Sequence, residues 1–156
     1  AMAQYKCIAD LLNAVQVDFE QLETLRDDRD SHDTDEHDGA SWADVYPEES
    51  AELATLEAAA GDYADEDEAR TALLDNALDV QVRSGWTAPG QQLVPGEFML
   101  LLCTGGPAVR IVGELEDGTV TRAWMEYSDW STSWTECFAE GIDNDVLAEY
   151  AGFFFA

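Results

Sequence analysis

Carboxylates are the side chains with which this chain could do chemistry. The sequence holds 34 Asp and Glu residues against seven Lys and Arg, and its formal net charge is −27. Such a charge far exceeds what solubility requires, and its self-repulsion destabilises the compact state. We therefore look for function in the densest acidic runs. The candidate partner-binding residues are Asp27, Asp28, Asp30, Asp33, Asp35, Glu36, Asp38, Asp62, Asp65, Glu66, Asp67 and Glu68.

Catalysis has little support in the sequence. Lys6 is the sole lysine and follows no glycine-rich phosphate loop, and no serine lies in a GxSxG motif. The two histidines, His32 and His37, lie in the first acidic run. A Cys–His pair would form there only if the fold brought a cysteine to them. We expect a protein that is not an enzyme, with no catalytic residues and no cofactor.

Cation binding is the second chemistry that the first acidic run could perform, because Asp, Glu and His ligate hard and borderline metal ions. The closest alignment with an EF-hand loop starts at Asp33. It places Asp38 where the loop requires glycine and Asp44 where it requires a bidentate glutamate. The motif therefore fails, and we expect no specific metal site.

The first half of the chain has the pattern of helices. Apolar residues spaced by three and four from Tyr5 to Leu22 predict one amphipathic helix over about residues 4–29. Residues 30–46 show no period and predict a loop.

Two further helices are predicted from their end signals. Pro47 suits a first helical turn, and Gly61 ends the helix that follows it. Asp65 can cap a third helix, with Glu68 as its capping-box partner.

The second half has the pattern of strands. Alternating apolar and polar residues begin at residue 78, and we expect an antiparallel sheet of four strands over 78–127. The run 98–103 is apolar throughout, which predicts a central strand buried on both faces.

The turn Asp117-Gly118 predicts the clearest hairpin. A two-residue turn there places Gly113 opposite Arg122, with room for the guanidinium. The same register sends Arg110 and Arg122 to opposite faces, so each is expected to have its own carboxylate or backbone partner.

The predicted fold is α+β, with N-terminal helices and a C-terminal helix packed on one face of the sheet. We expect one domain over 1–156, made of an acidic helical part (1–77), the sheet (78–127), and a loop with a C-terminal helix (128–156). Residues 1–84 carry a net charge of −18 and residues 85–156 carry −9. The charge therefore follows the helices.

Two segments near the C-terminus resemble a known block. The stretch LLCTGGPAVRIVGEL (101–115), with MEYSDWSTSWTE (125–136), resembles a recurrent block in small acidic, uncharacterised proteins of proteobacterial plasmids, phages and integrative elements. The resemblance implies an accessory protein of a mobile genetic element. Such elements often encode anti-restriction and anti-CRISPR inhibitors. The block has no assigned catalytic residues, and it does not include the acidic half.

The leading hypothesis is a DNA mimic. Duplex DNA carries about one negative charge per 1.7 Å of axis, so the 23 carboxylates before residue 85 correspond to the phosphates of roughly 11 base pairs. Held on rigid helices, they would block the DNA-binding groove of a bacterial defence complex, and the chain would then be an inhibitor of the anti-CRISPR or anti-restriction class. We expect a basic DNA-binding protein as the partner, no direct nucleic-acid binding and no membrane contact.

Two alternatives from other classes remain. The chain could be an acidic adaptor or antitoxin-like protein that binds a basic partner unrelated to DNA. It could also be a highly soluble scaffold of the halophile type, whose acids only hydrate the surface.

The late aromatic residues and the cysteines carry less specific signals. Trp130 and Trp134 are either packed in a loop or anchors for a partner protein. Three cysteines lie far apart and outside any CxxC spacing, which is typical of free thiols in a reducing compartment. We expect a cytoplasmic protein.

Overall fold

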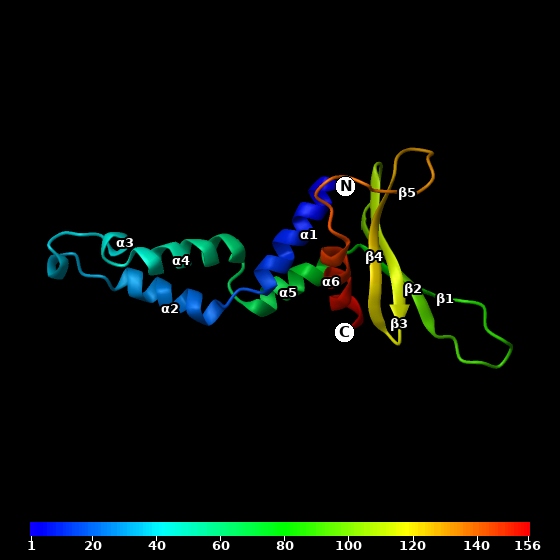
Figure 1. Cartoon of the computed structure of the whole chain (residues 1–156), viewed down its shortest axis with the longest axis horizontal. Coiled ribbons are helices and arrows are strands. Elements are labelled where there is room, and N and C mark those ends of the chain that lie inside the picture. The colour runs from blue at the N-terminus through cyan, green and yellow to red at the C-terminus, as the bar shows by residue number, and fades with distance from the viewer. The chain divides into compact units, whose positions relative to one another are not determined.

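The structure is a computed structural model that describes residues 1–156. Its helices and strands confirm the α+β class (Figure 1). They form two compact units: the helical unit, residues 10–71, and the sheet unit, residues 1–9 together with 72–156. The expected single domain stays a prediction. None of the helices combines the length and apolar character that crossing a membrane requires.

The predicted helix over residues 4–29 is wrong, because it divides into α1 (Met2–Val15) and α2 (Phe19–Asp30). Asp18 ends the continuity of the helix. Its backbone is extended, and its side chain accepts a hydrogen bond of 2.9 Å from the Gln21 N–H, so Asp18 caps α2. Val17, between the two helices, is also buried, so apolar packing continues across the break.

The helical unit is built around α2 and α4 (Pro47–Ala60), which pack side by side (Figure 1). A line of buried apolar side chains joins them: Val17, Leu22, Leu25, Trp42, Leu53 and Ala60. The predicted start at Pro47 and stop at Gly61 are both confirmed.

The segment between α2 and α4 is more ordered than the predicted loop. It contains the 3-10 helix η1 (Asp35–His37) and the short helix α3 (Trp42–Val45). Ser41 and Asp44 form a reciprocal capping box around α3, and their hydrogen bonds lower the pKa of the Asp44 carboxyl. This cap directs Trp42 into the apolar line between α2 and α4.

The predicted cap of the third helix is confirmed. Helix α5 (Glu66–Asp75) follows Asp65, whose Oδ1 accepts a hydrogen bond of 2.8 Å from the Glu68 N–H. The Glu68 carboxylate reaches back one residue beyond the cap, to the Ala64 N–H at 2.7 Å.

The sheet unit contains five antiparallel strands in sequence order. They are β1 (Asp79–Ser84), β2 (Pro95–Cys103), β3 (Ala108–Glu116), β4 (Thr119–Ser128) and β5 (Thr135–Glu136). The four predicted strands are present. The prediction missed β5, because two residues carry no alternation.

Helix α6 (Asn144–Phe155) packs against β4 and β3 and covers one face of the sheet. Asp143 caps it, since its side chain accepts a hydrogen bond from the Asp145 N–H. Strand β2 lies inside the sheet, but β3 is the middle strand and β2 is not buried on both faces. Phe98, Leu100 and Leu102 are buried, whereas Met99 and Leu101 on the other face are half-buried. That second face, which we call the open face, has no helix packed on it (Figure 1).

A β-bulge changes the predicted register of the hairpin between β3 and β4. Leu115 pairs with Val120, but Glu114 pairs with Arg122, so Thr121 is the extra residue. Arg110 and Arg122 therefore lie on the same face, and the prediction of opposite faces is wrong. Separate partners are confirmed, since Arg110 pairs with Glu126 at 2.7 Å and Arg122 with Glu114 at 3.7 Å.

Gly113 faces Ala123 instead of Arg122. A Cβ at this position would lie against the backbone oxygen of Arg122 and 2.5 Å from the Phe98 ring. The glycine therefore makes room for an aromatic ring in the core, and the predicted space for a guanidinium is wrong.

Tyr150 gives the fold a dependence on alkaline pH. The side chain is fully buried, its hydroxyl accepts a hydrogen bond of 3.0 Å from Asn76, and burial raises its pKa to about 12. Because the folded pKa exceeds the ordinary value of about 10, this group stabilises the fold below pH ~10. That stability is lost as the pH rises from about 10 to about 12.

We predict that Tyr150→Phe removes this loss, which is on the order of 2 kcal/mol in the free energy of unfolding. Urea unfolding at several pH values between neutrality and pH ~12 measures it. Tyr127→Phe, at a partly exposed position, is the control and should keep the wild-type pH dependence. An unchanged alkaline fall in Tyr150→Phe would show that Tyr150 is not its source.

Candidate functional site

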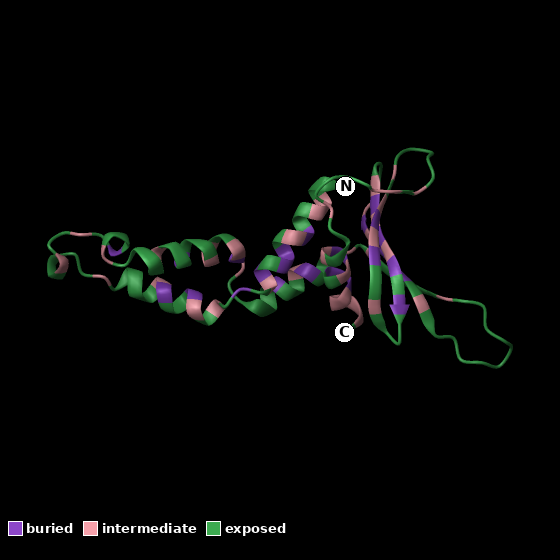
Figure 2. Cartoon of the chain, viewed as in Figure 1, coloured by how far each residue is buried: buried purple, intermediate pink, exposed green.

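All twelve predicted acids are exposed, and the structure places them in two groups within the helical unit (Figure 2). The tip cluster comprises Asp27, Asp28, Asp30, Asp33, Asp35, Glu36 and Asp38, at the end of α2 and around η1. The root cluster comprises Asp62, Asp65, Glu66, Asp67 and Glu68, between α4 and the first turn of α5. The 14 residues of α4 separate the two groups by about 21 Å.

Most of the tip cluster is not neutralised by the protein. Asp30 pairs with its neighbour Arg29 at 2.9 Å, and the Asp33 carboxylate accepts the Asp35 N–H at 2.8 Å. The other carboxylates of the cluster make no hydrogen bond or ion pair. Their charges are therefore available to a partner.

The root cluster divides in the same way. Asp65 and Glu68 are occupied in capping α5. Asp62, Glu66 and Asp67 make no hydrogen bond or ion pair. Glu66 and Asp67 also lie in the first turn of α5, where the positive end of the helix dipole favours negative charge.

The arginines nearest to these clusters hold the two long helices together. Arg26 Nε lies 3.0 Å from Glu57 Oε1, and Arg29 Nη1 lies 3.5 Å from the same oxygen. Both contacts join α2 to α4. Residues 10–71 contain 21 acids and three bases. Two of the three bases are thus engaged in holding the helices, which leaves the clusters strongly negative.

A stripe of acids that the sequence analysis missed runs along α2 into the tip cluster. Glu20, Glu23, Asp27 and Asp30 follow one another at spacings of three, four and three residues. On a helix these positions share one face, opposite Leu22 and Leu25, and rise by about 5 Å per step on average. The prediction of one long helix hid this signal, because continuing its apolar face beyond Leu22 would place Glu23 and Asp30 on that face.

The histidines lie in a hollow of about 390 Å³ beside the tip cluster. The His32 and His37 rings stack with their centroids 4.8 Å apart, and Tyr46 meets both rings edge-on. His32 Nε2 also contacts the Ala40 carbonyl oxygen at 3.0 Å. No group of three or more His, Cys, Asp or Glu side chains in the structure is placed to hold a metal ion.

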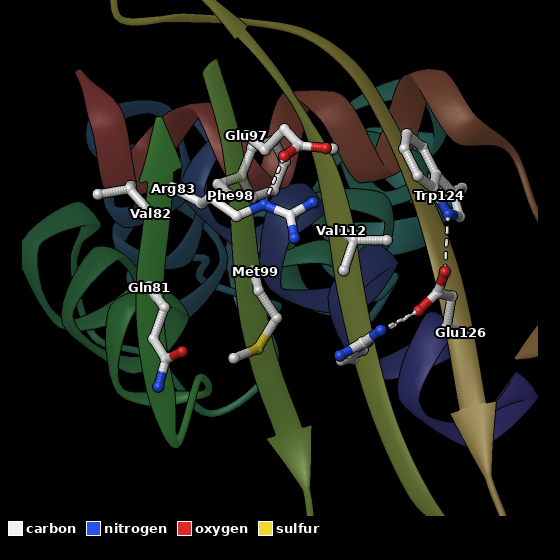
Figure 3. Close-up of a pocket in the computed structure, with 11 residues that line it drawn as sticks. Gln81, Val82, Arg83, Glu97, Phe98, Met99, Val112, Trp124 and Glu126 are labelled. Carbon is white, nitrogen blue, oxygen red and sulfur yellow. Dashed lines mark hydrogen bonds and ion pairs between the residues drawn. The ribbon is translucent and has the colours of Figure 1, made fainter. Parts of the chain in front are cut away.

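The open face of the sheet carries a second polar group (Figure 3). Glu126 accepts hydrogen bonds from Arg110 at 2.8 Å and from the Trp124 indole at 3.2 Å, and the Arg110 guanidinium stacks on Trp134, 4.1 Å from the ring centroid. Arg83 binds Glu97 at 2.6 Å and lowers the pKa of that carboxyl. Each of these arginines has a glutamate partner, so this face compensates its own charges.

Trp130 and Trp134 have different roles in the loop between β4 and β5. Trp134 is half-buried against Arg110, as expected of a packed residue. Trp130 is exposed, and the loop that holds it is stiffened by hydrogen bonds of Asp129 with Thr132. The indole lies over Gly106 of the turn between β2 and β3. A role of Trp130 as a partner anchor stays a prediction.

Comparison with protein-family models, curated proteins and solved structures finds no match to this chain. The resemblance of residues 101–115 and 125–136 to proteins of mobile elements therefore stays a prediction. The structure brings the two segments together as adjacent strands with contacting loops.

The contact between Gly106 and Trp130 can be tested with two glycines of one turn. Gly105 and Gly106 both have positive φ, but only at Gly106 would a Cβ meet the indole. We predict that Gly106→Ala displaces the Trp130 ring, whereas Gly105→Ala adds backbone strain alone. Fluorine NMR of protein labelled with fluorotryptophan should show a shifted Trp130 resonance in Gly106→Ala only. An equal shift in both variants would contradict the packing described.

Proposed function

We propose that the helical unit mimics the charge of duplex DNA and occupies the DNA-binding groove of a basic protein. The expected targets are bacterial defence complexes that must bind DNA, which would make the chain an inhibitor of the anti-restriction or anti-CRISPR class. The observation that carries this proposal is the charge density of α2, α4 and the segment between them.

The number of negative charges per unit length is of the same order as in duplex DNA. Residues 18–60 hold 15 acids and two arginines, and α4 has 14 residues. A helix of that length spans about 21 Å, over which duplex DNA carries about 12 phosphate charges. An arginine-rich and lysine-rich groove would thus meet a comparable number of negative charges along a comparable length.

Rigidity supports a mimic over a disordered acidic tail. The apolar line from Val17 to Ala60 and the shared contact of Arg26 and Arg29 with Glu57 fix the two helices to each other. Carboxylates on such a support lose little conformational entropy when a partner binds. The protein therefore presents its charge in a preformed arrangement.

The uneven distribution of charge favours a binding surface over a hydrated scaffold. The helical unit has a net charge of −18, whereas the larger sheet unit has 13 acids and four bases, a net charge of −9. Acids that served only to hydrate the surface would have no reason to concentrate on the smaller unit.

The inhibitory step that follows is electrostatic and non-covalent. The field of the helical unit attracts a cationic groove and speeds the encounter. Contacts between carboxylates and the Lys or Arg side chains of the groove then exclude DNA. Binding weakens as salt is added, because screening reduces the attraction between the two surfaces.

The proposal is tested by capturing partners from a bacterial lysate treated with nuclease, with the protein immobilised. We expect the captured proteins to bind DNA and to be released by duplex DNA at constant salt. Captured proteins that resist saturating duplex DNA would contradict the mimic and favour the acidic adaptor.

Charge reversal in the tip cluster provides a sharper test on the captured partner. The variant Asp28→Lys, Asp35→Lys and Glu36→Lys alters exposed acids without a side-chain partner. Its matched control, Asp75→Lys, Glu116→Lys and Glu140→Lys, changes the net charge equally on the sheet unit. We predict a slower association rate, by about tenfold or more, for the tip variant and a smaller change for the control. Equal effects of the two variants would assign binding to net charge alone.

A further inference from the structure

Strand β1 and the segment after it interrupt the acidic surface. Residues 80–96 contain no Asp or Glu, although the chain as a whole has a net charge of −27. This stretch also holds exposed apolar side chains, including Val80 at 44%, Val82 at 51% and Trp86, which is fully exposed. An exposed apolar segment without acids is the part of this surface that another negatively charged molecule can approach at least electrostatic cost.

The position of β1 leaves it available for pairing. It is an edge strand of the sheet, so one side of its backbone has no neighbouring strand. Val80 pairs with Leu100 of β2, and Val82 pairs with Phe98. Both valines therefore project on the same face of the sheet as these two buried residues. The two valines stay exposed because α6 packs against β4 and β3. Strand β2 lies between β1 and those two strands, so α6 does not cover β1.

We propose that β1 pairs in antiparallel fashion with β1 of a second copy of the chain, about a two-fold axis at Gln81. This register is self-complementary. It places Asp79 opposite Arg83 of the second copy, and Arg83 opposite Asp79, on the open face. On the other face it places Val80 opposite the second copy's Val82. The two sheets then continue into one.

The side chains involved are free to make these contacts. Arg83 is mostly exposed and its Nε binds Glu97, while a guanidinium has further N–H donors that can meet a second carboxylate. Asp79 accepts a hydrogen bond of 2.7 Å from Gln81 through one oxygen, which leaves the other oxygen available. Opposite charges directly across an antiparallel pair stabilise it, and like charges destabilise it.

Salt separates this association from the proposed inhibition. Two copies of a −27 chain repel each other, so screening should strengthen the dimer. Binding of a basic target should instead weaken with salt. The dimer does not depend on the proposed function, and either can fail without the other.

Sedimentation velocity under reducing conditions tests the proposal, with reductant present because Cys7, Cys103 and Cys137 form no disulfide. In about 1 M salt, where the Debye length is ~3 Å, the mass should rise with concentration from 17.2 kDa toward twice that value. The interface is small, so the dimer should be weak and require high protein concentration. A monomer at every concentration in high salt would overturn the proposal.

The register is tested with two single variants and their mixture. Arg83→Glu alone sets Asp79 against a glutamate, and Asp79→Arg alone sets two arginines against each other. Each variant should self-associate about tenfold or more weakly than wild type. An equal mixture of the two should dimerise again, because both cross-strand pairs then have opposite charges. The double variant Asp79→Arg, Arg83→Glu should also dimerise by itself.

Thermal unfolding of each variant shows whether the monomer stays folded. Restored dimerisation in the mixture cannot arise from misfolded single variants, so the test remains decisive if one variant is less stable. Single variants that dimerise as well as wild type, or a mixture that stays monomeric, would overturn the proposed pairing.

Discussion

Electrostatic self-repulsion is the constraint on which the rest of this structure depends. A chain with a net charge of −27 must bury enough apolar surface to stay compact while it keeps its carboxylates apart and in water. No charged side chain is buried, and each unit has its own apolar interior. In the helical unit that interior is one line of side chains between two helices, so most residues of the unit are exposed (Figure 2).

The few cations mainly join elements, although Arg29 also pairs with Asp30 of the tip cluster. Five of the six arginines form ion pairs that connect α2 with α4, β1 with β2, or β3 with β4. Surface ion pairs contribute little individually, at most about 1 kcal/mol each. Their larger effect here is geometric: they orient the elements and leave most acids of the tip and root clusters without an ion-pair partner. A strong field on a fixed support is the property that the proposed inhibition needs.

The sequence predicted the parts of the fold that local signals determine. Pro47, Gly61 and Asp65 mark helix ends through backbone chemistry that acts within a few residues, and all three are confirmed. The twelve acids were also expected to be exposed, because ionised side chains are rarely buried without a partner. What they bind stays a prediction, since no contact within the chain depends on it.

The errors arose where the apolar pattern outweighed another local signal, or where tertiary packing decides the outcome. Asp18 breaks the predicted helix by capping the Gln21 N–H, although the apolar spacing continues from Tyr5 to Leu22. The bulge at Thr121 shifted one strand by a residue, which moved Arg122 to the face of Arg110. Burial of β2 on both faces was inferred from composition, but only tertiary packing decides how many faces a helix covers.

The central claim is that the helical unit takes the place of DNA on its target. The most direct measurement is the equilibrium affinity of the captured target for its DNA, in the absence and in the presence of saturating protein. The account predicts that the apparent affinity for DNA falls in proportion to the concentration of the protein, as in simple competition. A DNA affinity that stays unchanged while the target is saturated with the protein would contradict it.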